Sequence, residues 1–306
     1  MSDRSVGRLA LVGLLALLVV DLLLVALAFR PDAAGAVAQA SPPVSSPTTS
    51  TSTTTASASA GATPVAEVIA AVDGKRAWRG TLGSCRDGGA SLEVTTDGGR
   101  TWTKQDAPVP ALGRVQPVDA ERGFVIGAKG AACSVGEYAT DDDAASWRGP
   151  RSVDGGWSRL PGKDQEVITP ERPDARPCGS TTVLDLARVS ATRAVVLCAD
   201  GRLVRSTDGG ATWTTLATVE GALAVGARVD GSAPAVFIAR TTDDCAGVEV
   251  AKVSGTKVSK VDCVKASLGG AEGKVSISVV DEGGWLAVAD ATWRSDATLE
   301  TWRTVA

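Results

Sequence analysis

An eight-residue pattern occurs twice in this chain almost unchanged and once more in a weaker form. The full copies are TTDGGRTW at residues 95–102 and STDGGATW at 206–213, and the weaker copy is TDDDAASW at 140–147. Every copy has an Asp five residues before its Trp and a hydroxyl residue directly before that Trp. A pattern that returns within one chain indicates an array of similar units, of which propellers and solenoids are the common forms.

The composition of the pattern fits a tight hairpin turn. Its Asp can accept hydrogen bonds from the backbone N–H groups that follow, and the paired glycines supply positive φ without steric cost. The Thr and Trp favour the outgoing strand, and the Trp is large enough to fill the wedge between neighbouring sheets. The residues expected to hold these turns are Asp97, Gly99, Thr101, Trp102, Asp142, Trp147, Asp208, Gly210, Thr212 and Trp213. We interpret SDATLETW at 295–302, whose Asp lies one residue too early, as a decayed fourth copy.

The pattern resembles the Asp-box (BNR) repeat, S/T-x-D-x-G-x-T-W, of sialidase-like and sortilin-like propellers. The segments GFVIG at 123–127 and GWLAV at 284–288 are similar to strands of photosystem II stability/assembly-factor-like propellers, which carry the same box. The resemblance implies an all-β β-propeller of about five to six blades. The apolar run at 9–29 predicts one N-terminal transmembrane helix before it. It also implies that the boxes lie away from the active face. It implies neither a photosynthetic role nor a named partner.

Five stretches have the alternating apolar strands and the turns of a blade, namely 66–105, 110–149, 183–217, 219–261 and 273–306. Between the second and third lies a Pro- and charge-rich stretch, 150–182, which is either a long loop between blades or a degenerate blade. Long irregular loops in compact domains are often functional. We therefore expect this stretch to belong to the binding surface, with a disordered insertion as the alternative.

The N-terminal part predicts export and a membrane anchor. Residues 9–29 form an apolar run long enough to span a bilayer, and Arg4 and Arg8 favour a cytoplasmic N-terminus at residues 1–8. Asp21 lies within the run and is either a contact with a partner helix or a tolerated polar residue. The alternative is a protein secreted after signal cleavage near Ala40, where the chain reads AQA.

Residues 30–64 are typical of a disordered Ser/Thr/Pro-rich stalk, and residues 65–306 are expected to form the extracytoplasmic propeller. All six cysteines lie in this last part, and an even number in an exported domain suggests disulfides. Of the connectivities that six cysteines allow, proximity along the chain favours Cys178–Cys198 and Cys245–Cys263, which leaves Cys85 for Cys133.

The composition excludes several classes of function. A net charge of −4 without a basic stripe argues against nucleic-acid binding. The absence of histidine excludes Ser-His-Asp triads, Cys-His pairs and His-ligated metals, and we expect no metal and no cofactor. The arginine motif of sialidases is absent, and the single tyrosine, Tyr138, falls on a blade strand rather than an active face.

We therefore predict a non-catalytic, membrane-anchored, extracytoplasmic β-propeller of the bacterial cell envelope. Its expected partners are the membrane, through residues 9–29, and an unknown protein or glycan ligand. The alternatives are an exo-glycosidase of the sialidase type and a purely structural envelope protein.

Overall fold

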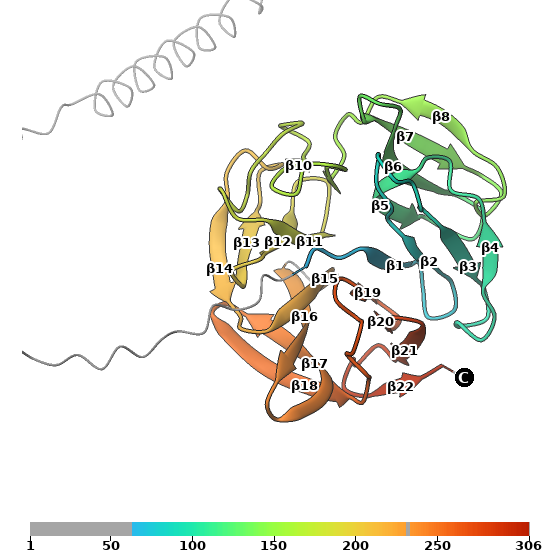
Figure 1. Cartoon of the computed structure of the whole chain (residues 1–306). Coiled ribbons are helices and arrows are strands. Elements are labelled where there is room, and N and C mark those ends of the chain that lie inside the picture. The colour runs from blue at the N-terminus through green and yellow to red at the C-terminus, as the bar shows by residue number, and fades with distance from the viewer. Residues whose placement is uncertain (1–62, 231–232, 306) are drawn as a thin grey trace, which may run out of the picture. The chain divides into compact units, whose positions relative to one another are not determined.

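The computed structural model describes residues 63–230 and 233–305. Within these residues every regular element is a β-strand, and the strands form five four-stranded antiparallel sheets arranged as blades around a central axis (Figure 1). This part of the chain is therefore an all-β, five-bladed propeller. Each blade is built from four strands that are consecutive in sequence, so no strand is exchanged between blades.

The blades follow the order of the chain. Blade 1 contains β1 (Glu67–Ala71), β2 (Ala77–Thr81), β3 (Leu92–Thr95) and β4 (Thr103–Gln105). Blade 2 contains β5 (Ala111–Pro117), β6 (Gly123–Lys129), β7 (Ser134–Thr140) and β8 (Arg148–Arg151). Blade 3 contains β11 (Val183–Arg188), β12 (Ala194–Cys198), β13 (Arg202–Ser206) and β14 (Thr214–Thr218). Blade 4 contains β15 (Ala222–Asp230), β16 (Ala233–Thr242), β17 (Cys245–Ser254) and β18 (Lys257–Val264). Blade 5 contains β19 (Val275–Val280), β20 (Gly283–Val288), β21 (Ala291–Ser295) and β22 (Trp302–Thr304).

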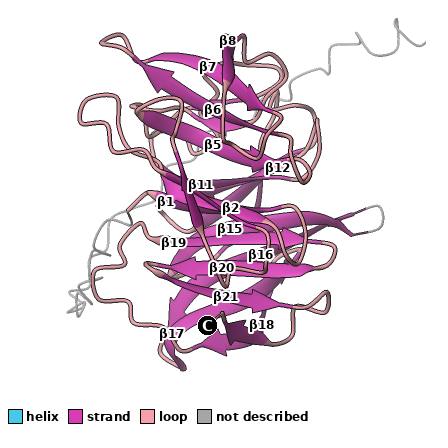
Figure 2. Cartoon of the chain, turned by 90° about the vertical axis from the view of Figure 1, so that its right-hand side faces the viewer, coloured by secondary structure: helices cyan, strands magenta, loops and turns pink. Residues whose placement is uncertain are grey.

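The first strand of each blade lies nearest the axis, and the later strands lie progressively further out (Figures 1 and 2). Strand β1 contacts both β5 and β19, so the first and last blades meet and the ring closes. Two of the second strands, β12 (AVVLC) and β20 (GGWLAV), are buried at every residue. Neighbouring blades cover both faces of these strands, which explains why their sequences are continuous apolar runs rather than alternating ones.

The stretch 150–182 forms a small antiparallel sheet of β9 (Ser158–Arg159) and β10 (Val167–Ile168) between blades 2 and 3. Strand β9 contacts both β5 and β11, so it fills the gap between the inner strands of these blades. Trp157, directly before β9, is fully buried. The stretch is thus closer to a degenerate blade than to an open loop. The alternative of a disordered insertion is wrong, because the stretch supplies residues to the core.

Tryptophans meet edge to face at three blade junctions. In each pair, one tryptophan follows a repeated turn and the other comes from the preceding blade or from the insertion. The pairs, with the distances between their ring centroids, are Trp102 with Trp285 (6.2 Å), Trp147 with Trp78 (6.0 Å) and Trp213 with Trp157 (5.9 Å). Such geometry stabilises an aromatic pair beyond the burial of its apolar surface.

The tryptophan of the preceding unit also donates a hydrogen bond across each junction. The acceptors are the Asp143 carboxylate for Trp78 (3.0 Å), the Ala191 carbonyl for Trp157 (2.9 Å) and the Asp73 carbonyl for Trp285 (2.9 Å). Trp157 of the insertion therefore makes the contacts that Trp78 on β2 and Trp285 on β20 make for complete blades. This equivalence explains how two short strands can replace a blade at this junction.

Three disulfides link parts of the ring, and no free cysteine remains among the described residues. Cys85–Cys133 joins blade 1 to the β6–β7 hairpin of blade 2, Cys178–Cys198 ties the insertion to β12, and Cys245–Cys263 joins β17 to β18. These are the pairs that proximity along the chain favoured.

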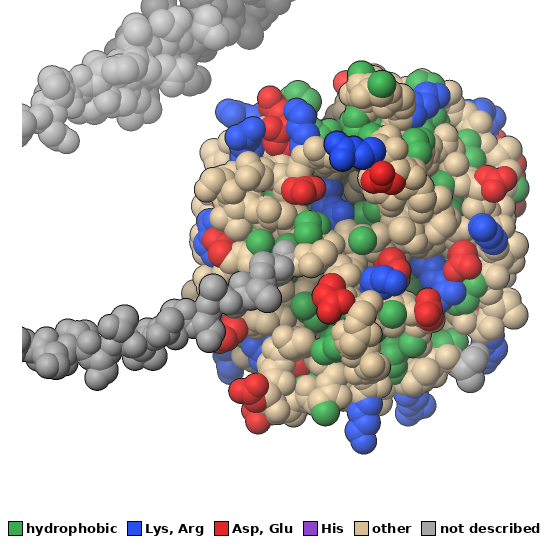
Figure 3. All heavy atoms as spheres, viewed as in Figure 1, with side chains coloured by type: hydrophobic (Ala, Val, Ile, Leu, Met, Phe, Trp, Pro, Cys, Tyr) green, Lys and Arg blue, Asp and Glu red, His purple; other side chains and the backbone are tan. Residues whose placement is uncertain are grey.

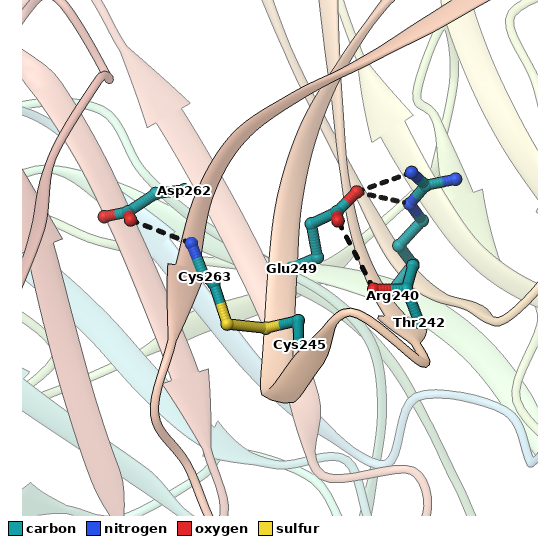
Figure 4. Close-up of a disulfide and its surroundings, with 6 residues drawn as sticks. All are labelled: Arg240, Thr242, Cys245, Glu249, Asp262 and Cys263. Carbon is teal, nitrogen blue, oxygen red and sulfur yellow. Dashed lines mark hydrogen bonds and ion pairs between the residues drawn. A yellow bond between two sulfur atoms is a disulfide. The ribbon is translucent and has the colours of Figure 1, made fainter.

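The disulfide of blade 4 lies beside two carboxylates (Figure 4). Asp262 accepts hydrogen bonds from the backbone N–H of Cys263 and from that of Trp302 in blade 5, both at 2.8 Å. The buried Glu249 accepts from Arg240 Nε at 2.7 Å and pairs with the rest of that guanidinium. The disulfide therefore holds the strand whose carboxylate connects blade 4 to blade 5.

No helix among the described residues is long and apolar enough to cross a bilayer. The expected anchor at 9–29, its Asp21, the cleavage site near Ala40 and the stalk up to residue 62 all lie outside the described residues.

We predict that Trp157→Ala lowers the free energy of unfolding by about 3–5 kcal/mol, as truncation of a buried tryptophan usually does. The substitution removes a fully buried indole and a hydrogen bond that joins the insertion to blade 3. Urea unfolding of the full-length protein followed by circular dichroism measures the loss. Val118→Ala, at an exposed position, is the control and is expected to change stability by less than about 0.5 kcal/mol. A loss below about 1 kcal/mol for Trp157→Ala would contradict the proposed role of the insertion.

Candidate functional site

The three repeated turns share one hydrogen-bonding scheme. In the first, the Asp97 carboxylate accepts from Thr101 N at 3.0 Å and from Thr101 Oγ1 at 2.7 Å. Thr95 Oγ1 donates to Asp97 at 3.0 Å and accepts from Gly99 N at 3.0 Å. The same four bonds are made by Thr140, Asp142, Ala144 and Ser146 in the second turn and by Ser206, Asp208, Gly210 and Thr212 in the third. The hydrogen-bonding capacity of each Asp is therefore used inside its own turn.

Glycines let the two full turns bend sharply. Gly99 and Gly210 have φ of +86° and +92°, and a Cβ on Gly210 would lie 2.5 Å from Thr169 of the insertion. The weaker turn places Asp143 and Ala144 at φ of +55° and +66° instead, which L-residues adopt at a cost of about 1–2 kcal/mol each. The turn geometry thus persists even where its glycines have been lost.

Each repeated turn is bonded to the hairpin between the first and second strands of its own blade. The donors and acceptors are Gly98 N to Lys75 O, Asp143 N to Glu121 O, and Gly209 N to Thr192 O, at 2.8, 2.8 and 2.9 Å. The turns therefore lie at the end of the propeller where the inner strands finish. We call this end the turn face.

These hairpins form a second repeat that our sequence analysis missed. It reads VDGKR at 72–76, VDAER at 118–122 and VSATR at 189–193. In every copy the backbone N–H groups of its first two residues donate to the carbonyl of its Arg. The spacing V-[D/S]-x-x-R was visible in the sequence and could have marked the ends of the inner strands of blades 1, 2 and 3.

A cavity of about 140 Å³ occupies the centre of the ring, lined by the inner strands of all five blades and by β9. Its polar lining consists of Arg114, Gln116, Ser158, Arg159, Asp185, Arg188, Ser276 and Ser278. These residues lie far apart in the sequence, and the propeller alone brings them together. Three arginines and one aspartate give the cavity a positive charge, whereas the whole chain has a net charge of −4.

Residues 64–66, which we call the strap, cross the end of the cavity opposite the turn face (Figure 1). Val65 N donates to the Leu184 carbonyl of blade 3 at 3.0 Å, and Ala66 N donates to the Gly273 carbonyl at 2.6 Å. Arg159 of the insertion holds the strap by donating to the carbonyls of Val65 and Leu184, both at 2.5 Å. Burial lowers the pKa of Arg159, and the negative charges of Asp185 and Asp164 oppose that shift.

Asp185 connects the inner strands of blades 3 and 4. Its carboxylate accepts from its neighbour Leu186 N at 2.8 Å and from Val225 N at 2.9 Å. Burial raises the pKa of Asp185, while the Val225 hydrogen bond and the charge of Arg159 act in the opposite direction. This is the same bridge that Asp262 makes between blades 4 and 5, so we assign Asp185 a structural role.

Two arginines mark the end of the cavity at the turn face, which we call the mouth. Arg114 on β5 donates to the Trp157 carbonyl at 2.9 Å and to Gln116 Oε1 at 2.6 Å. Burial, reinforced by the nearby charge of Arg188, lowers the pKa of Arg114 to about 9. Arg188 ends β11 and is exposed, and its side chain makes no hydrogen bond or ion pair with the described residues. The mouth therefore holds two close positive charges without an acidic partner in contact.

Two exposed valines lie at the ends of inner strands, outside the lining of the cavity. Val118 follows β5 and Val229 lies near the end of β15, and they are 52% and 48% exposed. They are the large apolar side chains most exposed among the described residues. On the face seen in Figure 3, acidic and basic side chains are interspersed without a broad patch of one sign.

The remaining residues singled out in the sequence lie away from the cavity. Tyr138 is buried on β7, where its ring is 5.4 Å from the ammonium of Lys129, and its neighbour Glu137 pairs with Ile126. No group of three or more acidic or cysteine side chains suited to a metal ion occurs among the residues that the structure describes. The turn residues, the disulfides and the cavity therefore occupy separate parts of the ring.

The turn carboxylates should make stability depend on acid pH. Their hydrogen bonds, chiefly from Thr101, Ser146 and Thr212, lower the pKa of Asp97, Asp142 and Asp208 to about 2. Lowered pKa values contribute stability that is complete above the unfolded value of about 4 and is lost as the pH falls toward 2. We predict that urea midpoints measured from pH 6 to pH 2 fall more steeply for wild type than for the triple variant Asp97→Asn, Asp142→Asn, Asp208→Asn. The exposed control Asp154→Asn should follow wild type, and equal slopes for wild type and the triple variant would refute the assignment.

Among known proteins, this chain is similar only to solved structures. No protein-family model matches the chain, and no curated protein matches it either. Among solved structures, YCF48 bound to D1 peptide is 14% identical with a TM-score of 0.30, over 80% of this chain and 67% of that chain. A GH74 enzyme of Niastella koreensis is 13% identical with a TM-score of 0.40, over 78% and 46%. A fucose-specific lectin from Aleuria aurantia is 12% identical with a TM-score of 0.34, over 79% and 77%. These identities and scores are too low to assign a function.

Proposed function

We propose that this protein is a non-catalytic binding scaffold of the cell envelope, exported and attached to the membrane through residues 9–29. Its propeller binds a partner protein or a glycan, and an anionic group of that partner enters the mouth of the central cavity. We further infer that the repeated turns are Asp boxes that hold the blades together and take no part in binding. The exo-glycosidase, the structural envelope protein and the secreted form are the alternatives.

The observation that carries the proposal is the pair of guanidinium groups at the mouth. Arg114 is fixed by its hydrogen bonds to Trp157 and Gln116, while Arg188 is exposed and has no acidic partner among the described residues. Two close like charges are unfavourable unless an anion joins them, and guanidinium groups bind carboxylates and phosphates with defined geometry. The hydrogen bonds of Arg114 hold its guanidinium in place before the ligand arrives, which reduces the ordering cost of binding.

A binding role agrees better with this site than hydrolysis does. Asp185 is the only acidic residue that lines the described cavity, and its carboxylate is engaged by two backbone N–H groups. Glycoside hydrolysis commonly uses a pair of carboxyl groups on either side of the scissile bond. The cavity of about 140 Å³ has room for roughly five water-sized groups, so it suits one polar group of a larger partner.

We predict that Arg188→Gln weakens binding of acidic ligands at least tenfold, because hydrogen bonds to charged groups contribute about 1.5–3 kcal/mol. The full-length protein in detergent micelles is tested against arrays of acidic peptides and carboxylate-bearing glycans, each with its neutral amide counterpart. The matched control is Arg205→Gln, which removes an exposed arginine on β13 outside the cavity. Equal binding by Arg188→Gln and wild type would refute the mouth as the site. Sugar release by wild type would favour the glycosidase instead.

A further inference from the structure

A second group of arginines lies on the turn face at the junction of blades 5 and 1. Arg294 on β21 and Arg303 on β22 are directly opposite each other in the register of these strands. Arg100 reaches the same place from the first repeated turn, in blade 1. All three line one groove of about 640 Å³, whose other lining residues are Gly98, Glu282, Ser295, Asp296, Thr304 and Val305. This groove is separate from the central cavity.

The positive charges of this groove are not neutralised by contact. None of the three arginines forms an ion pair within the described part of the chain. Like charges directly opposite on neighbouring strands destabilise a sheet. The Asp296 carboxylate at the groove is already occupied by the N–H and hydroxyl groups of Thr298. An arrangement of this kind costs stability unless an anion compensates it.

Arg294 is held in position by its neighbours. Its guanidinium lies 4.9 Å from the centroid of the Trp285 ring, and it donates a long hydrogen bond of 3.5 Å to the Gly98 carbonyl. Its Nε atom is buried and has no hydrogen-bond partner. Burial lowers the pKa of Arg294, and the charge of Arg100 adds to that effect. The side chain is therefore ordered while part of its donor capacity is unused.

The decayed fourth turn leaves another donor without an acceptor. In the three intact turns the first hydroxyl, on Thr95, Thr140 or Ser206, donates to the Asp two residues later. In the fourth turn the Asp is Asp296, which lies one residue too early. Ser295 is 6% exposed, and its Oγ atom is buried and has no hydrogen-bond partner. A buried donor without an acceptor is unfavourable. Blade 5 thus lacks a carboxylate where the other turns have one, next to three unpaired guanidinium groups.

We propose that this groove binds a phosphate group, which supplies the acceptor that the arginines and Ser295 Oγ lack within the described residues. The several oxygens of a phosphate can accept from more than one guanidinium group at once. The groove is much larger than the ion itself, so a phosphate monoester on a larger molecule fits as well as free phosphate. The site lies beyond the function proposed for the cavity mouth and does not depend on it.

Isothermal titration of the full-length protein in micelles, with inorganic phosphate and with glycerol 3-phosphate, tests the proposal. Every variant carries Arg188→Gln, so that the cavity mouth contributes little. Arg303→Gln should weaken binding of both probes about tenfold or more. The matched control is Arg205→Gln. Arg205 lies directly before the first hydroxyl residue of the third turn, as Arg294 lies directly before that of the fourth turn. On the neighbouring strand, however, Arg205 is paired with Thr214 rather than with an arginine. This control should keep the affinity within about twofold.

Thermal unfolding in phosphate and in chloride at equal ionic strength gives a second readout. A ligand that binds only the folded state stabilises it, and phosphate also stabilises folded proteins without a specific site. Phosphate should therefore raise the melting temperature of the Arg188→Gln protein more than that of the double variant with Arg303→Gln. Tighter binding of glycerol 3-phosphate than of phosphate would identify a monoester site, and equal binding a site for the free ion. The absence of binding by both probes, or equal affinities with and without Arg303, would overturn the proposal.

Discussion

At three junctions of the ring, the tryptophan that follows a repeated turn packs edge-on against a tryptophan of the preceding unit. The hydrogen bonds of the turn fix the position of its tryptophan. The partner indole donates a hydrogen bond back across the junction. A blade is too thin to bury its own second strand, so stability requires a neighbour on each face. The turn residues therefore matter less as a surface feature than as the local structure that aims a large aromatic side chain at the next sheet. Loss of one indole weakens two blades at once.

The insertion between blades 2 and 3 shows how little of a blade is needed at such a junction. Trp157 supplies the indole, β9 fills the gap between β5 and β11, and Arg159 holds the strap that crosses the ring. The same few residues close the ring, support Arg114 through the Trp157 carbonyl and line the cavity. A deletion of the stretch would therefore remove the scaffold as well as any binding surface, and only point substitutions can separate these roles.

The sequence predicted the features that depend on local chemistry. The turns follow from Asp, Gly, Thr and Trp at fixed spacing, and the disulfides join cysteines that are near neighbours along the chain. The V-[D/S]-x-x-R hairpins were equally local and could have been found. The cavity was beyond reach, because Arg114, Arg159 and Arg188 come from different units and become neighbours only when the ring closes. The role of Trp157 was hidden for the same reason, since nothing near it in sequence resembles a blade strand.

The hairpin repeat supplies a common frame in which the inner strands can be compared. Four positions before its valine stand Val68, Arg114 and Asp185, and one position before it stand Ala71, Pro117 and Arg188. The charge of Asp185 is used by the fold, because its carboxylate bridges blades 3 and 4. No contact within the described residues requires a charge at Arg188, and the displaced Asp296 leaves Ser295 Oγ without an acceptor. We therefore place binding at these two places rather than in the turns that hold the blades together.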